Sequence, residues 1–257
     1  MDISTYRQSP EEQERNKSLL SLIPMQGDAC LDIGTREGFY ALQMADRFSS
    51  VTALDLEKPE INHPNIECVK GDVAGLQFAD NAFDFVFCAE VLEHIPEQYL
   101  EKACSEIARV TNNAVLIGVP YRQDTRVARS TCVACGGINP PWGHINSFDE
   151  KRLISLFKGL HVERIEYVGT SREVTNWLST KLYDYSVNPF GTYTQEEPCI
   201  HCGARLSPPA SRSVSQKTAS KIAYNLDRLQ QSFTRPHANW IHILFKKTGA
   251  STSGIQQ

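Results

Sequence analysis

The spacing of hydrophobic and polar positions along the chain switches repeatedly between the period of a strand and that of a helix. Short apolar runs predict seven strands, at residues 29–34, 51–55, 66–72, 83–88, 114–119, 162–168 and 240–245. Helical spacing predicts helices at residues 10–22, 38–45, 96–110, 147–158 and 214–233. Ser9, Pro10 and Glu12 form a capping pattern at the start of the first helix. Strands that alternate with helices predict a parallel sheet covered on both faces.

Two interruptions of this alternation predict insertions into the sheet domain. We expect a single domain over residues 1–249, with insertions at residues 121–146 and 170–238 that form a lid. The second insertion is far longer than the ordinary connection of a few residues between strands. The small, polar residues 250–257 predict a disordered tail.

Composition and charge exclude few classes of protein. The 41% of hydrophobic residues is ordinary for a globular domain, and the net charge of -4 does not require an anionic partner. Residues 205–247 are nevertheless basic, with one acid, Asp227, among eight lysines and arginines. A solvated helix face explains this stretch better than an anionic partner does, and both interpretations stay open.

The start of the chain has no pattern of a signal peptide, and no apolar run approaches the roughly 18 residues of a membrane span. We therefore expect a cytoplasmic protein without a membrane partner. In that compartment the eight cysteines argue against a framework of disulfides. Oligomeric state does not follow from the sequence.

Acidic residues end three successive predicted strands. Asp32 and Gly34 end the first strand and Gly38 opens the following helix, which is the pattern of a nucleotide-binding turn. Asp55 ends the second strand, where an acid can accept both hydroxyls of a ribose. Asp72 ends the third, where a carboxylate can accept from an adenine amino group. Because open α/β sheets bind ligands at the carboxyl ends of their strands, these residues together predict a site for an adenosyl cofactor.

The segments LDIGTREG, ALDLE, KGDV and FDFVFCAEVLEHIPE resemble the class I S-adenosylmethionine-dependent methyltransferases, especially the small-molecule group with the ubiquinone-pathway enzymes. The resemblance covers residues 28–120 and the last pair of strands. It implies an α/β fold with a Rossmann-like seven-stranded sheet, mostly parallel with an antiparallel last strand. It also implies a role in binding the cofactor for eight residues: Asp32, Gly34, Thr35 and Gly38 at the methionyl part, Asp55 at the ribose, Asp72 and Val73 at the adenine, and Ala89 beside them.

Two features of the turn bear on this resemblance. The family usually has a glycine in the middle of the turn, where this chain has Arg36. A dinucleotide-dependent dehydrogenase is the competing interpretation of such a turn. A dinucleotide site needs the pattern GxGxxG, and Glu37 would repel the pyrophosphate, so the dehydrogenase is disfavoured.

A second cluster, Glu90, Glu93 and His94, has the spacing of one face of a helical turn after the fourth strand. Two carboxylates and an imidazole can hold a divalent cation such as magnesium or manganese, with His144 as a fourth ligand. This motif resembles the metal-dependent O-methyltransferases that act on small-RNA 3′ ends and on ubiquinone precursors. The metal would lower the pKa of an acceptor hydroxyl. Without a metal, His94 or His144 would be the general base, unless the histidine only packs.

Two CxxCG units, at Cys132–Cys135 and Cys199–Cys202, predict a structural zinc site of four thiolates. A redox pair is the alternative, but such a pair usually occurs once, at the start of a helix. The zinc would connect the two insertions into one lid. The other four cysteines fall in predicted strands or a helix and are expected in the core.

Three functions follow as hypotheses. The first is methyl transfer from S-adenosylmethionine to a hydroxyl of a small molecule, such as a sugar or a natural-product intermediate. The second is methylation of RNA or another nucleic acid, with the basic residues 205–247 holding the substrate. The third is a non-catalytic binding module that contains zinc. The sequence does not identify the acceptor, because specificity would lie in the insertions.

Overall fold

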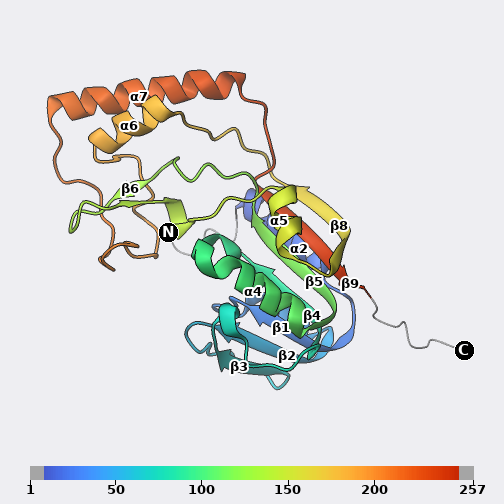
Figure 1. Ribbon diagram of the computed structural model, residues 1–257. Coiled ribbons are helices and arrows are strands. Elements are labelled where there is room, and N and C mark those ends of the chain that lie inside the picture. The colour runs from blue at the N-terminus through green and yellow to red at the C-terminus, as the bar shows by residue number, and fades with distance from the viewer. Residues whose placement is uncertain (1–8, 249–257) are drawn as a thin grey trace, which may run out of the picture. The chain divides into compact units, whose positions relative to one another are not determined.

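The predicted strands assemble into one seven-stranded sheet, in a computed structural model that describes residues 9–248. Its members are β1 (Gly27–Ile33), β2 (Phe48–Asp55), β3 (Ile66–Lys70), β4 (Phe83–Ala89), β5 (Thr111–Pro120), β8 (Leu160–Val168) and β9 (Trp240–Lys247). Their order is β3-β2-β1-β4-β5-β9-β8 (Figure 1). The pairs among β1 to β5 are parallel, whereas β9 runs antiparallel to both β5 and β8. The predicted fold class is therefore confirmed.

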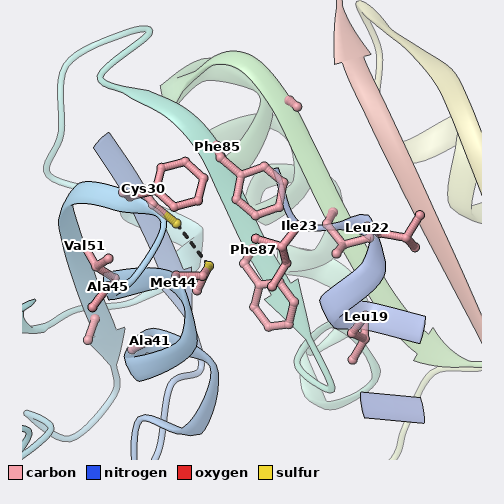
Figure 2. Close-up of a cluster of buried hydrophobic side chains, with 14 residues drawn as sticks. Leu19, Leu22, Ile23, Cys30, Ala41, Met44, Ala45, Val51, Phe85 and Phe87 are labelled. Atoms are coloured by element: carbon pink, nitrogen blue, oxygen red, sulfur yellow. Dashed lines mark hydrogen bonds between the residues drawn. The ribbon is translucent and has the colours of Figure 1, made fainter. Parts of the chain in front are cut away.

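One face of the sheet packs against α2 (Pro10–Leu22) and α3 (Phe39–Ala45). Leu19 and Leu22 of α2 and Met44 of α3 meet Phe85 and Phe87 of β4 in one buried cluster (Figure 2). The thiol of Cys30 on β1 lies 3.2 Å from the sulfur of Met44, so this cysteine is a core residue, as expected. Side chains that alternate along β4 thus place both phenylalanines on the same face.

The opposite face is covered by α4 (Glu97–Val110), which buries Leu100, Ala103, Cys104, Ile107 and Val110 at helical spacing. Cys88 of β4 alternates with Phe87 and therefore points to this side. There, burial and the nearby Cys104 raise the pKa of its thiol. Helix α5 (Glu150–Leu156) begins at Asp149, whose carboxylate accepts from the N–H of Arg152 at 2.8 Å. These helices and the sheet belong to one compact unit, residues 13–120, 148–168 and 240–248, here called the sheet unit.

The second compact unit, here called the insert unit, comprises residues 9–12, 121–147 and 169–239. Its long helix α7 (Val214–Phe233) has the predicted bounds, and the Ser213 hydroxyl and the Gln216 side chain cap it reciprocally. The shorter helix α6 (Trp177–Tyr185) packs against α7, and the strands β6 (Ser130–Thr131) and β7 (Ile138–Asn139) form a small hairpin. None of these three short elements was predicted.

Helix α7 packs through small residues rather than through its large apolar ones. Its buried residues are Ala219, Ser220 and Ala223. The stripe of Ile222, Leu229 and Phe233 is exposed, with 82% of the Phe233 side chain accessible. Small side chains allow α6 to approach closely, and polar contacts such as Thr175 to Asp227 at 3.0 Å fix the pair.

Two predictions concern the last residues of the chain and membrane-spanning helices. The predicted disordered tail, residues 250–257, lies outside the residues that the structure describes. Among residues 9–248, no helix has both the length and the apolar character that a membrane crossing requires.

Candidate cofactor and acceptor site

The turn after β1 is held open by two glycines in the left-handed conformation. Gly34 has φ of 77° and Gly38 has φ of 82°. A Cβ atom on Gly34 would lie 2.3 Å from a methyl group of Val91, and one on Gly38 would lie 2.4 Å from Ile61. The N–H of Gly34 donates to the Leu54 carbonyl on β2 at 2.8 Å. Only glycine meets both the conformation and the lack of space, so the turn holds its backbone close to β2.

Asp32 fixes this turn from within the sheet. Its buried carboxylate accepts from the Thr35 hydroxyl at 2.7 Å and from the backbone N–H of Ala41. Burial raises the pKa of Asp32 to about 7, although both hydrogen bonds oppose that shift. Asp32 and Thr35, both predicted at the methionyl part, therefore bind each other and shape the turn.

Asp55 lies at the end of β2 with a partly used carboxylate. One oxygen accepts from the N–H of Arg36 at 2.9 Å, and the other accepts from the N–H of Leu56 at 2.7 Å. A carboxylate offers about four acceptor positions, so each oxygen keeps one for a further hydroxyl. Arg36, at the position of the family's middle glycine, has φ of 46° and thus adopts the glycine-like conformation. The departure at Arg36 changes the side chain but keeps the backbone path.

Beyond β3, Asp72 begins the short 3-10 helix η1 (Val73–Gly75). One Asp72 oxygen accepts from the N–H of Ala74 at 2.8 Å, and the side chain of Val73 is buried. Leu56, directly after Asp55, is 65% exposed although it is a large apolar residue. Leu56 was not predicted as a site residue. Its position directly after the acid that ends the strand is the sequence signal that could have indicated it. Asp32, Asp55 and Asp72 thus lie at the carboxyl ends of three neighbouring strands.

The segment after β4 is not the single helical turn that the spacing of Glu90, Glu93 and His94 suggested. Glu90 has φ of 57°, and helical geometry is confined to the 3-10 helix η2 (Leu92–His94). The Glu90 carboxylate forms an ion pair with Arg15 of α2 at 2.9 Å. This correction follows from the backbone, because a left-handed residue turns the chain sharply and ends the common helix face.

Glu93 is a buried carboxylate at the start of this site. Its side chain is inaccessible, and within the described residues neither of its oxygens has a hydrogen-bond partner. Burial and the nearby Glu90 raise the pKa of Glu93 well above its ordinary value, against the opposing charges of Arg15 and Arg36. A ring nitrogen of His94 lies within 4.8 Å of a Glu93 carboxylate oxygen. Such a carboxylate is suited to hold a proton or a cation rather than to stabilise the fold.

His144, the predicted fourth ligand, belongs to the insert unit. Its side chain is 7% exposed, and Nδ1 lies 2.7 Å from Oε1 of Gln123, so the glutamine sets the orientation of the ring. Its predicted role as a ligand or a base remains a prediction.

Ala89, predicted beside the cofactor, is the last residue of β4 and pairs with Gly118 of β5. Next to this pair lies His242 of β9, a residue that the sequence did not single out. Its ring is buried, and Nδ1 lies 2.8 Å from the Ser18 hydroxyl. A Cβ atom on Gly118 would lie 3.2 Å from both Ala89 and His242, so the three residues are packed in one layer.

The sulfur atoms of Cys132, Cys135, Cys199 and Cys202 lie within 4.8 Å of one another in the insert unit. The predicted basic stretch, in contrast, is divided between the two units. Lys246 and Lys247 belong to β9 in the sheet unit, whereas the basic residues from Arg205 to Arg235 belong to the insert unit. The Lys247 ammonium group donates to the carbonyl of Thr111 at 2.7 Å, so it is engaged within the fold.

Comparison with known proteins finds a family match over part of the chain. Residues 31–117 match the family model described as a methyltransferase domain. The match covers the glycine turn, the three strand-end carboxylates and the segment from Glu90 to His94. The sheet order with β9 antiparallel is that of Rossmann-like methyltransferases.

Similar curated proteins match over the same part of the chain. The ubiquinone biosynthesis O-methyltransferase of Paracidovorax citrulli is 27% identical over 100 residues, which are 34% of this chain and 42% of that protein. The demethylmenaquinone methyltransferase of Renibacterium salmoninarum is 34% identical over 90 residues, covering 33% and 37%. The bifunctional biotin biosynthesis protein BioHC of Cellvibrio japonicus is 34% identical over 100 residues, covering 36% and 20%. The match thus spans less than half the length of each relative.

Solved structures agree in fold over nearly the whole chain. The N-methyltransferase NodS of Bradyrhizobium japonicum has a TM-score of 0.52 at 13% identity, with 94% of this chain and 98% of that chain covered. It has also been solved with S-adenosyl-L-homocysteine. The [4+2]-cyclase SpnF has a TM-score of 0.54 at 14% identity, with 93% and 83% covered. A cyclase and an N-methyltransferase share this fold, so the fold does not determine the reaction.

Proposed function

We propose that this chain is an S-adenosylmethionine-dependent methyltransferase that methylates a hydroxyl group of a small molecule. The observation that carries the proposal is the row of carboxylates at the ends of β1, β2 and β3, beside a turn that only glycine can make. The methyltransferase-domain match over residues 31–117 and the O-methyltransferase among the relatives support it.

The residues of this edge fit an adenosyl cofactor. Asp55 retains one acceptor position on each oxygen, which is what the two ribose hydroxyls require. Asp72 keeps one oxygen for the adenine amino group, and the exposed Leu56 and the buried Val73 offer apolar contact to the ring. The sharp turn at Gly34 and Gly38 and the small side chain of Ala89 are the features that we assign to the methionyl part. When bound, the cofactor supplies a methyl group on a positively charged sulfur.

Glu93 and His94 are the groups that we assign to the acceptor. The acceptor oxygen forms its bond to the methyl carbon as the carbon–sulfur bond breaks and the sulfur becomes neutral. The hydroxyl proton must leave the oxygen, and the His94 imidazole is the base, with the Glu93 carboxyl group within 4.8 Å of a ring nitrogen. A divalent cation on Glu93 and His94 is the alternative activator. Its predicted ligand Glu90 is already paired with Arg15, which disfavours it.

The second candidate, methylation of nucleic acid, loses support because Lys247, one of its basic residues, is engaged by backbone carbonyls. Tritiated methyl transfer into a cell extract distinguishes the two. Label in the small-molecule fraction supports the proposal, and label that ribonuclease removes supports the alternative. Transfer to neither, with the cofactor bound, favours the third candidate, a binding module.

Calorimetry on the full chain tests the cofactor site directly. The variant Asp55→Asn keeps the size of the side chain but replaces one acceptor oxygen by a donor. A hydrogen bond to a charged group contributes about 1.5–3 kcal/mol, so the Kd for S-adenosylhomocysteine should rise at least about tenfold. The control Asp46→Asn, at the exposed end of α3, should bind as the wild type does. Absence of binding to folded wild-type protein would refute the proposal.

A further inference from the structure

The four cysteines of the insert unit lie in two loops with the same backbone path. In the first loop the N–H of Gly136 donates to the carbonyl of Cys132 at 2.8 Å, and in the second the N–H of Gly203 donates to that of Cys199 at 2.8 Å. Both glycines have φ of 72°. The first cysteine of each loop donates its own N–H to the residue five positions on, at 2.8 Å and 2.9 Å. Two loops far apart in the sequence therefore present their thiols in the same way.

The distances between the sulfur atoms fit a metal site. Cys132 and Cys202 are 3.8 Å apart, and Cys135 and Cys199 are 3.7 Å apart, so each short distance joins one loop to the other. A zinc–sulfur bond of about 2.3 Å in a regular tetrahedron separates neighbouring sulfur atoms by about 3.8 Å. The observed distances are therefore those of four thiolates around one tetrahedral ion.

Hydrogen bonds around the thiols hold the two loops together. The N–H of Gly137 points at the sulfur of Cys135 at 3.4 Å. Asn139 is fully buried, and its side chain accepts from the N–H of Ile200 and donates to the carbonyl of Gly137, which links the two loops.

Two alternatives, a disulfide and a site with His201 as a ligand, fit these residues less well. A disulfide requires about 2.05 Å between sulfur atoms, and the observed distances are far longer. His201 lies inside the second loop and could replace a cysteine as a ligand. Its Nε2 is instead 3.0 Å from the carbonyl of Ile138, and its ring packs over Gly137. The imidazole is thus a contact between the loops rather than a ligand.

We infer that Cys132, Cys135, Cys199 and Cys202 bind one zinc ion in a closed site, and that this ion holds the insert unit together. The apolar cluster at this place contains only three buried residues, Cys132, Cys199 and Leu206. A core of that size cannot organise two long irregular segments, so the metal supplies the missing stability. With four protein ligands no position is open to a substrate, which makes the site structural and separate from the proposed methyl transfer.

Metal analysis of the purified full chain is the first test. We expect one zinc per chain, and X-ray absorption should show four sulfur neighbours at about 2.3 Å. The exposed ligands give the variants Cys135→Ser and Cys202→Ser, each of which should lose most of the zinc. The controls are Cys68→Ser, a thiol of the sheet unit, and His201→Gln, which both should retain it. Zinc loss in His201→Gln with a nitrogen neighbour in the wild-type spectrum would overturn the four-thiolate assignment.

Hydrogen exchange on the wild type tests the role of the ion without relying on any variant. After removal of zinc with a chelator under reducing conditions, residues 121–147 and 169–239 should lose protection, whereas β1, β2 and β4 should keep it. Restoring zinc should restore protection. Equal protection with and without zinc would overturn the structural role. No bound metal after expression in zinc-supplemented medium, together with disulfides in the native protein, would overturn the site itself.

Discussion

His242 should make the sheet unit sensitive to acid. The ring is buried, with Nδ1 at the Ser18 hydroxyl, and burial together with the cation of Arg15 lowers its pKa to about 3. In the unfolded chain a histidine has a pKa near 6.5. Above about pH 6.5 the ring is neutral in both states, so its titration does not change the free energy of unfolding. Below it the unfolded state binds a proton that the folded state cannot bind, so stability is lost as the pH falls.

The size of the effect follows from the two pKa values. Each pH unit between about 6.5 and about 3 costs about 1.36 kcal/mol, so His242 should remove about 2 kcal/mol by about pH 5. The variant His242→Asn offers an amide where Nδ1 lies, so Ser18 keeps a partner, and it does not titrate in this range. The variant will be less stable than the wild type near neutral pH, and this gap should narrow by about 2 kcal/mol at about pH 5.

Urea unfolding followed by tryptophan fluorescence measures the gap. The chain has 3 tryptophans, and the background Trp142→Phe with Trp177→Phe leaves Trp240, which reports on the sheet unit. Asp32 and other acids titrate in both proteins and cancel in the difference. His161→Asn, at an exposed residue of β8, controls for the loss of one histidine. A gap that stays constant within about 0.5 kcal/mol, or that widens in acid, would refute this reasoning.

Two further predictions concern the candidate site. A left-handed arginine costs the folded state about 1–2 kcal/mol, and Arg36→Gly removes this strain. The glycine costs about 0.5–1 kcal/mol in return, because it loses more chain entropy on folding, so the free energy of unfolding should not fall. Arg36→Val should lower it clearly in urea titrations, and equal losses in both variants would contradict the backbone argument. Glu93→Gln removes a buried carboxylate whose raised pKa costs stability as the pH rises above its ordinary value. It should gain about 1–3 kcal/mol near pH 8, with the gain shrinking in acid, and lose at least tenfold in methyl transfer. Full activity in Glu93→Gln would remove Glu93 from the proposed chemistry.

The sequence predicted the sheet well because its central strands are largely buried. The run of β4 is apolar apart from Asp84, and Gly34, Asp55 and Glu90 mark the carboxyl ends of β1, β2 and β4. The same edge brings Asp32, Asp55 and Asp72 together once the strand order is known. Helix α7 was also predicted with its bounds, because its apolar residues recur at helical spacing.

Other features depend on contacts that no local pattern contains. The spacing of Glu90 and Glu93 suggested one helix face, yet Glu90 is left-handed and paired with Arg15, a residue far away in the sequence. The apolar stripe of α7 is exposed because its small residues provide the contact with α6. The sequence showed no partner for His242, since only the folded sheet places it against Gly118.

The pairing of β8 with β9 shows where residues 169–239 leave the sheet. Val168 pairs with Trp240 in an antiparallel ladder, so residues 169–239 stand where a hairpin needs only a short turn. A gene that encodes such a turn in their place would still specify every strand of the sheet. One long segment between two adjacent strands can therefore be exchanged without altering the register of either.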